Sequence, residues 1–305
     1  MSNLLRAEFL RLVSRRLTWA LLFVTVAFGA LVALASAGEV RPQSPDDHAQ
    51  AEQQYREYMS YFDDPECSGS PGNCGSPEDL TVADFLRVPV DYEPYLTSVI
   101  STAPLVLVAT TVLASLLIGS EFSSGSLSTQ LMFTPRRRWV MTAKVAAASA
   151  GAVGLMFAFI ASVMTFGTIT FLLLRGGSDV VASVALPLRF GGLLLATFAT
   201  ALLAASLTFG LGSSGLALGA GVVVLVASEM YVGSSPHLRL AERFMPNVNL
   251  GALMGSDFRY TYWDPITEAQ LPIVTFGWAA VYALVLVAVV TAVCVWVFPR
   301  RDLLR

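Results

Sequence analysis

Long uncharged stretches set the pattern of this chain, and polar residues gather between them. A helix that crosses the roughly 30 Å hydrocarbon core of a membrane needs about 20 consecutive apolar residues. Five long stretches contain no Asp, Glu, Lys, Arg or His: 17–36 with two further uncharged residues, 94–120, 145–174, 190–228 and 269–298. The pattern therefore predicts several membrane-spanning helices.

The fourth of these stretches is too long for a single span. Its 39 residues would form a helix of about 58 Å, roughly twice the membrane. Between Gly210 and Gly215 stand three glycines and two serines, which are the residues that a tight turn prefers. We therefore expect six spans, at 17–37, 96–118, 146–174, 189–210, 215–232 and 273–298.

Composition narrows the class of protein. Only 13% of the 305 residues are charged and 55% are hydrophobic, whereas about 25% of a typical soluble domain is charged. Such a chain is too apolar for a disordered protein. Its net charge of −3 also argues against a nucleic-acid binder. The expected fold class is an all-α integral membrane protein.

Basic residues divide unequally between the two sides of the membrane. Six spans place both termini and the loop 119–145 on one side, with eleven bases and three acids, and leave eight bases and nineteen acids on the other. Because short basic loops stay in the cytoplasm, we expect a bacterial-type cytoplasmic (inner) membrane and cytoplasmic termini. Ala35-Ser36-Ala37 also resembles a signal-peptide cleavage site. The apolar stretch before it exceeds a signal core of about 7–15 residues, so we interpret it as an uncleaved first span.

The polar segment 38–95 holds thirteen acids and three arginines, and we expect a small α-helical subdomain outside the cytoplasm. Two serine-proline-acid sequences, beginning at Ser44 and Ser76, are typical of helix starts and predict two helices. Cys67 and Cys74 lie between these helices and predict a disulfide on an oxidising side. A metal site is the alternative, although only His48 is near them in sequence.

A search for catalytic chemistry excludes several classes of protein. The sequence Gly212-Ser213-Ser214-Gly215 suggests an intramembrane serine protease, but both histidines lie in outside loops and could not activate the serine. The P-loop of an ATPase requires Gly-x-x-x-x-Gly-Lys-Ser/Thr. The chain has one lysine, Lys144, in a different context. We expect no catalytic site and no metal, and any energy that the protein uses must come from elsewhere.

Only a few side chains in the spans are candidates for a substrate path. Glu229 stands near the outer end of the fifth predicted span, where it either reaches headgroups, pairs with an arginine such as Arg189, or forms a gate or substrate contact. Met156 and Phe159 are candidates for lining an apolar path, with ordinary helix packing as the alternative.

Two elements of the cytoplasmic side carry the most specific pattern. Residues 3–16 predict an amphipathic helix in the membrane interface, in which Glu8 is spaced to pair with Arg11. In the segment 119–145, a short helix is expected to begin at Ser123 or Ser124 and to stop at Pro135. Its apolar Leu127 and Leu131 suggest docking into a groove on a partner. The alternative is a solvated loop whose arginines only enforce topology.

This segment resembles the coupling region of ABC type-2 transporter permeases. In that family, Gly-x-Glu ends the second span, and a Gly-Thr/Ser-Leu, a Pro, an Arg and a Lys follow. The matching positions here are Gly119, Glu121, Gly125, Ser126, Leu127, Pro135, Arg136 or Arg138, and Lys144. The resemblance implies that 119–138 and the N-terminal helix transmit ATPase closure to the spans. The residues expected to take part in this coupling are Glu121, Phe122, Gly125, Leu127, Leu131, Pro135 and Arg136.

The resemblance also implies partners. It predicts two ABC ATPase subunits on separate chains, which bind the ATP and Mg, and a second permease subunit, identical or homologous. This chain itself would hold no cofactor. Family members often carry short re-entrant helices before the last span, and Asn249 to Phe258 is a candidate for one.

The expected domain organisation follows from these interpretations. It comprises the amphipathic helix and first span (1–37), an extracytoplasmic subdomain (38–95), the second span (96–118), the coupling region (119–145), spans three to five (146–232), an extracytoplasmic loop (233–272), and the last span with its basic tail (273–305).

The function we expect is that of a permease subunit of an ATP-driven exporter for a drug, lipid or peptide. The alternatives are a non-transporting sensory or mechanotransmission complex, and a translocase for lipids or cytochrome assembly.

Overall fold

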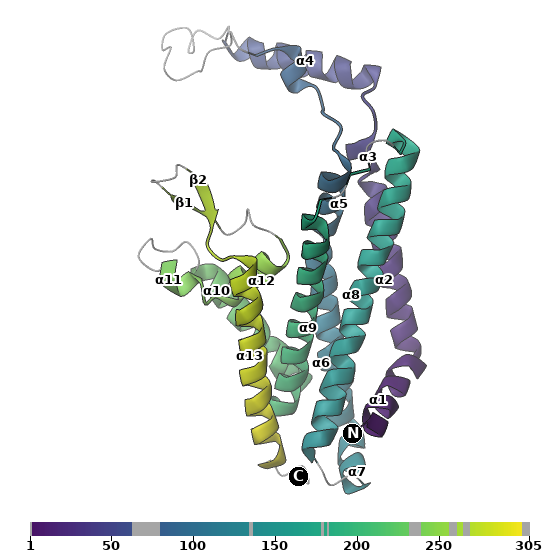
Figure 1. Cartoon of the computed structure of the whole chain (residues 1–305), viewed down its shortest axis with the longest axis vertical. Coiled ribbons are helices and arrows are strands. Elements are labelled where there is room, and N and C mark those ends of the chain that lie inside the picture. Colours follow the sequence, from purple (N-terminus) through teal and green to yellow (C-terminus); the bar gives the residue numbers. More distant parts are fainter. Residues whose placement is uncertain are drawn as a thin grey trace.

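The computed structural model of the chain is mostly helical, with long helices running side by side (Figure 1). It describes residues 2–62, 80–133, 137–177, 180–181, 183–231, 239–255, 261–264 and 269–300. The α-helices are α1 (Ser2–Ser14), α2 (Arg16–Ala35), α3 (Ala37–Val40), α4 (Pro45–Phe62), α5 (Tyr92–Ile100), α6 (Ala103–Ser123), α7 (Ser126–Phe133), α8 (Arg137–Arg175), α9 (Ala185–Leu211), α10 (Ser214–Tyr231), α11 (Arg239–Glu242), α12 (Pro246–Leu253) and α13 (Phe276–Val297). The shorter elements are the 3-10 turns η2 (Val82–Phe85) and η4 (Phe298–Arg300) and the strands β1 (Thr261–Asp264) and β2 (Ala269–Pro272).

Five helical segments of the described residues are long and apolar enough to cross a membrane: Arg16–Val40, Tyr92–Ser123, Arg137–Arg175, Ala185–Leu211 and Phe276–Val297. The fifth span that the sequence predicts corresponds to α10, whose apolar part, Ser214–Met230, is shorter than these. Its 18 residues would reach about 27 Å, slightly less than the hydrocarbon core. The chain is thus a membrane protein with several apolar helices, and a sixth span stays a prediction.

The break between α9 and α10 lies where the glycines predict it. Gly212 ends α9 in the left-handed conformation, with φ 73°, and its N–H bonds the carbonyl of Thr208. Glycine adopts this conformation without the steric cost that a Cβ brings.

The second predicted span, 96–118, differs from a single rod. It consists of α5 and α6, which are separated by a turn at Ser101 and Thr102. Pro104 follows in the first turn of α6, where its missing N–H costs no hydrogen bond. The Tyr95 hydroxyl donates to the carbonyl of Ala33 at 2.6 Å, which ties α5 to α2.

Small and hydroxyl-bearing residues bring the spanning helices close together. Ser115 on α6 and Thr208 on α9 share a hydrogen bond of 2.7 Å, and both are buried. A Cβ built on Gly192 of α9 would lie 1.9 Å from the carbonyl oxygen of Leu253 on α12. Such close contacts replace the hydrophobic effect as the force between helices in a membrane, because lipid is as apolar as the side chains.

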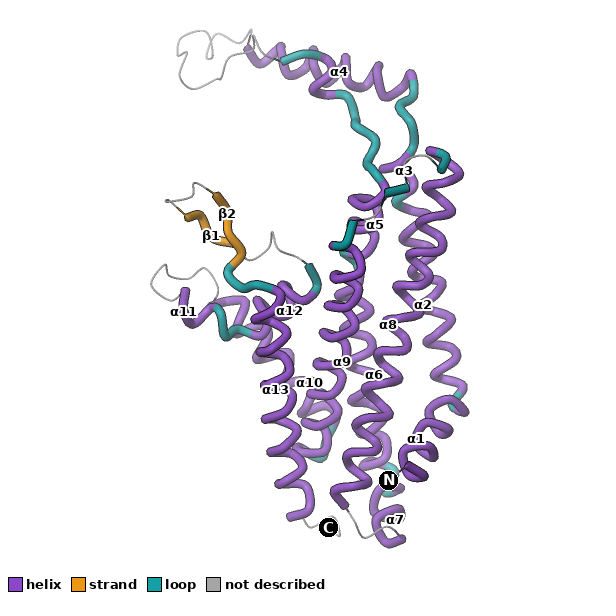
Figure 2. The backbone as a smooth tube through the Cα atoms, viewed as in Figure 1, coloured by secondary structure: helices purple, strands orange, loops and turns teal. Residues whose placement is uncertain are grey.

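Helix α4 lies across one end of the bundle, and two loop segments connect it to α3 and α5 (Figure 2). Tyr55 and Tyr58 of α4 contact Phe85 of η2 in edge-to-face and tilted geometries, with ring centroids 5.8 and 5.5 Å apart. The first predicted helix of the segment 38–95 is therefore present as α4. The second prediction is wrong over the described residues 80–91, where one 3-10 turn, η2, is the only helical element before α5.

Polar contacts fix the base of α4. The Ser44 N–H and hydroxyl donate to the Asp47 carboxylate at 2.7 and 2.9 Å, and Arg41 pairs with it at 2.7 Å. These bonds stabilise the charged form and hold the pKa of Asp47 below its ordinary value, the Ser44 N–H contributing most. Cys67 and Cys74 lie outside the described residues, so their pairing stays a prediction.

The region before α13 adds one short strand pair to an otherwise helical fold over the described residues. Strands β1 and β2 form an antiparallel pair in which Thr261 is opposite Pro272. Nearby, α12 packs on α9, α10 and α13. Two side chains of α13 hold the chain just before α12, because Trp278 Nε1 donates to the carbonyl of Arg243 and the Tyr282 hydroxyl to that of Phe244.

Candidate coupling site

The segment expected to bind a partner forms a helical elbow at the end of the bundle opposite α4 (Figure 1). Helix α6 ends at Ser123, and Gly125 turns the chain with φ 69° before α7 begins at Ser126. The predicted short helix is thus present, but it begins at Ser126 and not at Ser123 or Ser124, because α6 continues through Ser123. Pro135 and Arg136 lie outside the described residues. Helix α8 begins at Arg137, so Arg137 and Arg138 of the basic cluster belong to the helix that forms the third span.

Leu127 faces the bundle, contrary to the expectation that it is presented to a partner. It is 2% exposed and belongs to a core cluster that includes Ile118, Met141 and Phe209. Leu131 is half-buried against the same cluster. The spacing of four residues correctly predicts that the two leucines share a face of α7, but that face packs inward.

The exposed apolar side chains of α7 are its last two. Met132 is 71% exposed and Phe133 is 85% exposed. Apolar side chains of this size at a helix end are typical of anchors that insert into a partner's pocket. We call Met132 and Phe133 the α7 tip.

A chain of aromatic rings connects the elbow to the last helix. Phe122 contacts Phe209 of α9 with ring centroids 5.6 Å apart, and Phe209 contacts Phe298 of η4 at 5.1 Å. Both contacts are edge-to-face, the geometry that aromatic pairs prefer. A displacement of the elbow would therefore reach α9 and the end of α13 through close-packed side chains.

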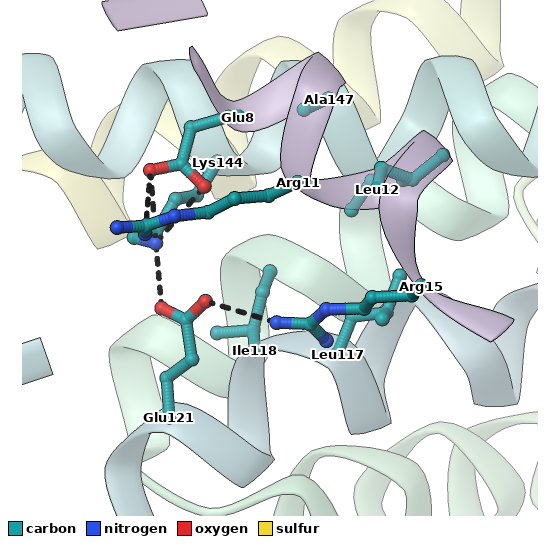
Figure 3. A pocket seen from close by; sticks show the side chains of 10 residues that line it. Glu8, Arg11, Leu12, Arg15, Leu117, Ile118, Glu121, Lys144 and Ala147 are labelled. Carbon is teal, nitrogen blue, oxygen red and sulfur yellow. Dashed lines mark hydrogen bonds and ion pairs between the residues drawn. The ribbon is translucent and has the colours of Figure 1, made fainter. Parts of the chain in front are cut away.

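Beside the elbow lies a buried group of charges, shown in Figure 3. Lys144 of α8 stands between two carboxylates, with Nζ 3.1 Å from the oxygens of Glu8 and 2.6 Å from Glu121 Oε2. The second contact is an ion pair without the angles of a hydrogen bond. Arg15 approaches the other oxygen of Glu121 at 3.6 Å, and Arg11 approaches Glu8 at 3.4 Å. The predicted pairing of Glu8 with Arg11 is confirmed.

The charges of this group are buried and therefore need partners. The Lys144 and Glu8 side chains are only 3% and 7% exposed. They line a cavity of about 30 Å³ between α1, α6 and α8, which has room for about two waters. Desolvated charges are tolerated only when they are paired, so each member of the group depends on the others.

The residues proposed for a substrate path lie apart from the elbow. Met156 and Phe159 are fully buried in the core cluster around α8, where Phe159 stacks on Phe28 of α2 at 6.0 Å. They fill the interior of this chain, which is the packing alternative that the sequence left open. Glu229 accepts a hydrogen bond of 2.5 Å from Asn247 Nδ2 and so links α10 to α12.

Sequence reasoning missed Gln130 and the inward direction of Glu8. Gln130 Nε2 donates to Glu8 Oε1 at 3.1 Å, across 122 positions of the chain. One signal was available for Glu8, because it is the only acid in an otherwise basic helix and stands four residues from both Leu4 and Leu12. Nothing in the local pattern indicates the partner on α7.

Of three comparisons with known proteins, one gives a match. A model of the family described as "ABC-2 family transporter protein" matches residues 2–303. No curated protein and no solved structure matches the chain. Since the matched region covers nearly the whole chain, the protein belongs to the ABC-2 family of transporter membrane proteins, whose members are the membrane subunits that associate with an ABC ATPase and are not ATPases themselves.

Proposed function

We propose that this chain is the permease subunit of an ATP-driven ABC exporter. A pair of such subunits, identical or homologous, would work with two ATPase subunits in a bacterial-type cytoplasmic membrane, with both termini in the cytoplasm. The observation that carries the proposal is the elbow of α6 and α7. It combines a buried leucine, which fastens α7 to the bundle, with an exposed apolar tip for a partner.

The elbow suggests how ATP hydrolysis would act on the membrane helices. An ATPase that grips Met132 and Phe133 would push or pull α7 as it closes and opens. Leu127 would pass that displacement to the core between α6 and α8, and Phe122 would pass it to α9. Coupling of this kind needs two arrangements of the bundle, one of which the partner's closed state favours.

The composition of the spans favours a hydrophobic or amphipathic substrate, such as a drug, a lipid or a peptide. Between Lys144 and Arg175, α8 contains no ionisable residue, and the same holds for α9 after Arg189. Carriers of ions usually place ionisable groups inside the membrane. The buried polar groups of α6 and α9 in the described spans are hydroxyls such as Thr110, Ser115 and Thr197, each of which has a hydrogen-bond partner.

A second candidate, a mechanotransmission complex, draws support from the attachment of α4. Arg87 donates to the carbonyls of Gly38 and Arg41, and the Val90 N–H donates to the carbonyl of Glu39. These bonds join both connections of α4 to the outer end of the first span. A ligand on α4 could therefore act on the spans without transport. A translocase for lipids or cytochrome assembly stays a further alternative.

The test is co-purification with an ATPase that carries Walker motifs and is encoded in a neighbouring reading frame. We expect the wild-type permease to retain this ATPase and to stimulate its turnover, and we expect the double variant Met132→Ser, Phe133→Ser to lose it while inserting normally. Val184→Ser is the matched control, because Val184 is 89% exposed but lies at the other end of the bundle. Leu127→Ala is a second control. It should lower the stability of the permease, because removing the buried leucine side chain leaves a cavity in the core.

Two outcomes would contradict the proposal. Retention of the ATPase by the double variant would show that the α7 tip is not the docking site. Failure of the wild type to bind any ATPase would remove the exporter function itself. Coupled turnover without movement of any hydrophobic probe across proteoliposomes would favour the mechanotransmission complex.

A further inference from the structure

Glu8 is the residue through which α1 meets the rest of the molecule. Leu4, Glu8 and Leu12 stand at successive four-residue intervals and therefore share one side of α1. Leu4 packs on the core cluster around Leu127, and Leu12 lies against Gly151 of α8. A carboxylate thus occupies the middle of a stripe that faces protein, while Leu10 and Val13 are exposed on other sides.

The Glu8 carboxylate receives donors from three helices. Lys144 Nζ of α8 is 3.1 Å away, Gln130 Nε2 of α7 donates at 3.1 Å, and Arg11 of α1 itself approaches at 3.4 Å. Glu8 therefore joins α1 directly to α7 and α8. Among the described groups that bond Glu8, Gln130 is the one from the helix that carries the α7 tip.

Charge balance makes these contacts hard to separate. Lys144 is shared by Glu8 and Glu121, and Arg15 supplies the second cation for Glu121. Withdrawing α1 from α8 would remove Glu8 and Arg15 together, leaving Glu121 with Lys144 alone and Glu8 with Arg11. Separating buried ions from their partners is strongly unfavourable, whereas moving them as a group costs no desolvation.

The resemblance to ABC type-2 permeases already implies that the N-terminal helix transmits ATPase closure to the spans; we propose that Glu8 is the positioning residue that makes α1, α7 and the first turns of α8 move as one body in that step. The inference rests on the proposed function and extends it, because the residues proposed to meet the ATPase lie on α7 whereas Glu8 lies on α1. Lys144 is the cation that holds this body together, and Gln130 is its connection to α7. Helix α1 is followed directly by α2, so any rotation of the body acts on the first span.

One arm of the test uses Lys144 as a reporter. Because the chain contains a single lysine, an amine-reactive reagent can modify only Lys144 and the N-terminal amine. In the purified permease we expect modification of Lys144 to be roughly a hundredfold slower than in the chain unfolded in SDS, since reaction requires local opening. Glu8→Gln should accelerate it by at least about tenfold, because the lysine loses a buried counter-charge. The control is Glu52→Gln, which removes an exposed ion pair with Arg56 on α4 and should change nothing.

Equal rates of modification in wild type and Glu8→Gln would overturn the inference. So would rapid modification of Lys144 in the wild type, or its modification only when ATP is being hydrolysed, because a single moving body keeps Lys144 covered throughout the cycle.

The other arm measures the complex with the ATPase. Glu8→Gln should retain the bound ATPase but lower its stimulated turnover by at least about tenfold, since a displaced α1 no longer follows α7. Lys144→Met should behave like Glu8→Gln, whereas Lys144→Arg should preserve turnover because it keeps the charge. A residue with a merely structural role would not distinguish arginine from methionine once the complex has assembled.

The outcomes separate the two proposals. If the wild type binds no ATPase, the exporter function fails and takes the transmission step with it. If the wild type is stimulated and Glu8→Gln is stimulated equally, only this inference fails.

Discussion

Replacing Gly192 by alanine should unseat α12 from α9. Gly192 lies in the buried face of α9, where a Cβ would meet the carbonyl oxygen of Leu253 at 1.9 Å and Phe276 Cε2 at 2.9 Å. Ordinary carbon–oxygen contacts stand at about 3.3 Å. The oxygen belongs to backbone, so no rotamer change relieves the overlap. Helix α12 must therefore move away by about 1.4 Å, the difference between these two separations.

Two opposing terms set the size of the effect. Overpacking of this kind costs about 3 kcal/mol, the upper part of the usual range, because a whole helix must shift. Alanine in place of glycine within a helix recovers about 1 kcal/mol. The net loss of stability is therefore about 2 kcal/mol. With a shift of about 2 °C per kcal/mol for a chain of this size, the melting temperature should fall by about 4 °C.

The neighbouring glycine provides the control. A Cβ built on Gly191 meets nothing within 4 Å, and Gly191 is exposed. Gly191→Ala should therefore leave the stability unchanged or raise it by up to about 1 kcal/mol. Its melting temperature in detergent should accordingly stay the same or rise. Hydrogen exchange should also accelerate in α12 for Gly192→Ala alone. A Gly192→Ala variant that melts at or above the temperature of Gly191→Ala would refute this account of how α12 is held.

Two further predictions concern other parts of the bundle. Ser115→Ala should destabilise by about 0.6 kcal/mol, measured by SDS-induced unfolding, because Thr208 keeps its bond to the Ala204 carbonyl; a loss above about 2 kcal/mol would contradict this. Because the pKa of Asp47 is lowered in the folded protein, its ionised form should stabilise α4 fully at pH values above the ordinary pKa of 3.8. This contribution should vanish as the pH falls through the lower pKa of the folded state. As the pH falls through that value, the rate at which pepsin cleaves α4 should therefore rise more steeply in the wild type than in Asp47→Asn. An equal pH dependence in the two proteins would contradict this prediction.

Much of the architecture could be predicted because membranes simplify the pattern. Uncharged length indicates where helices cross, and the expected segments coincide with α2, α8, α9 and α13. Gly212 marks a turn because glycine adopts its left-handed backbone without cost, whereas the similar turn at Gly125 was not predicted. Whether α10 also crosses the membrane stays a prediction, because its apolar part, Ser214–Met230, is shorter than the five long segments.

The candidate site shows the limit of this approach. Periodicity places Leu127 and Leu131 on one face of α7, and it places Glu8 on one face of α1 with Leu4 and Leu12. It does not say which face looks inward. In a membrane or its interface, apolar side chains are stable on the lipid side as well as in the core, so hydrophobicity alone cannot choose the direction.

From the sequence alone follow a membrane protein, the positions of most of its helices, a helical elbow after the second span and the lack of an ATPase motif. Only the tertiary structure decides that Leu127 is buried, that Met132 and Phe133 are exposed, and that Glu8 meets Lys144 across 136 positions of the chain. The reason is physical. A local sequence pattern indicates the conformation of its own segment. The stability of a buried charge depends instead on its partners, and those come from distant helices that meet only when the bundle folds.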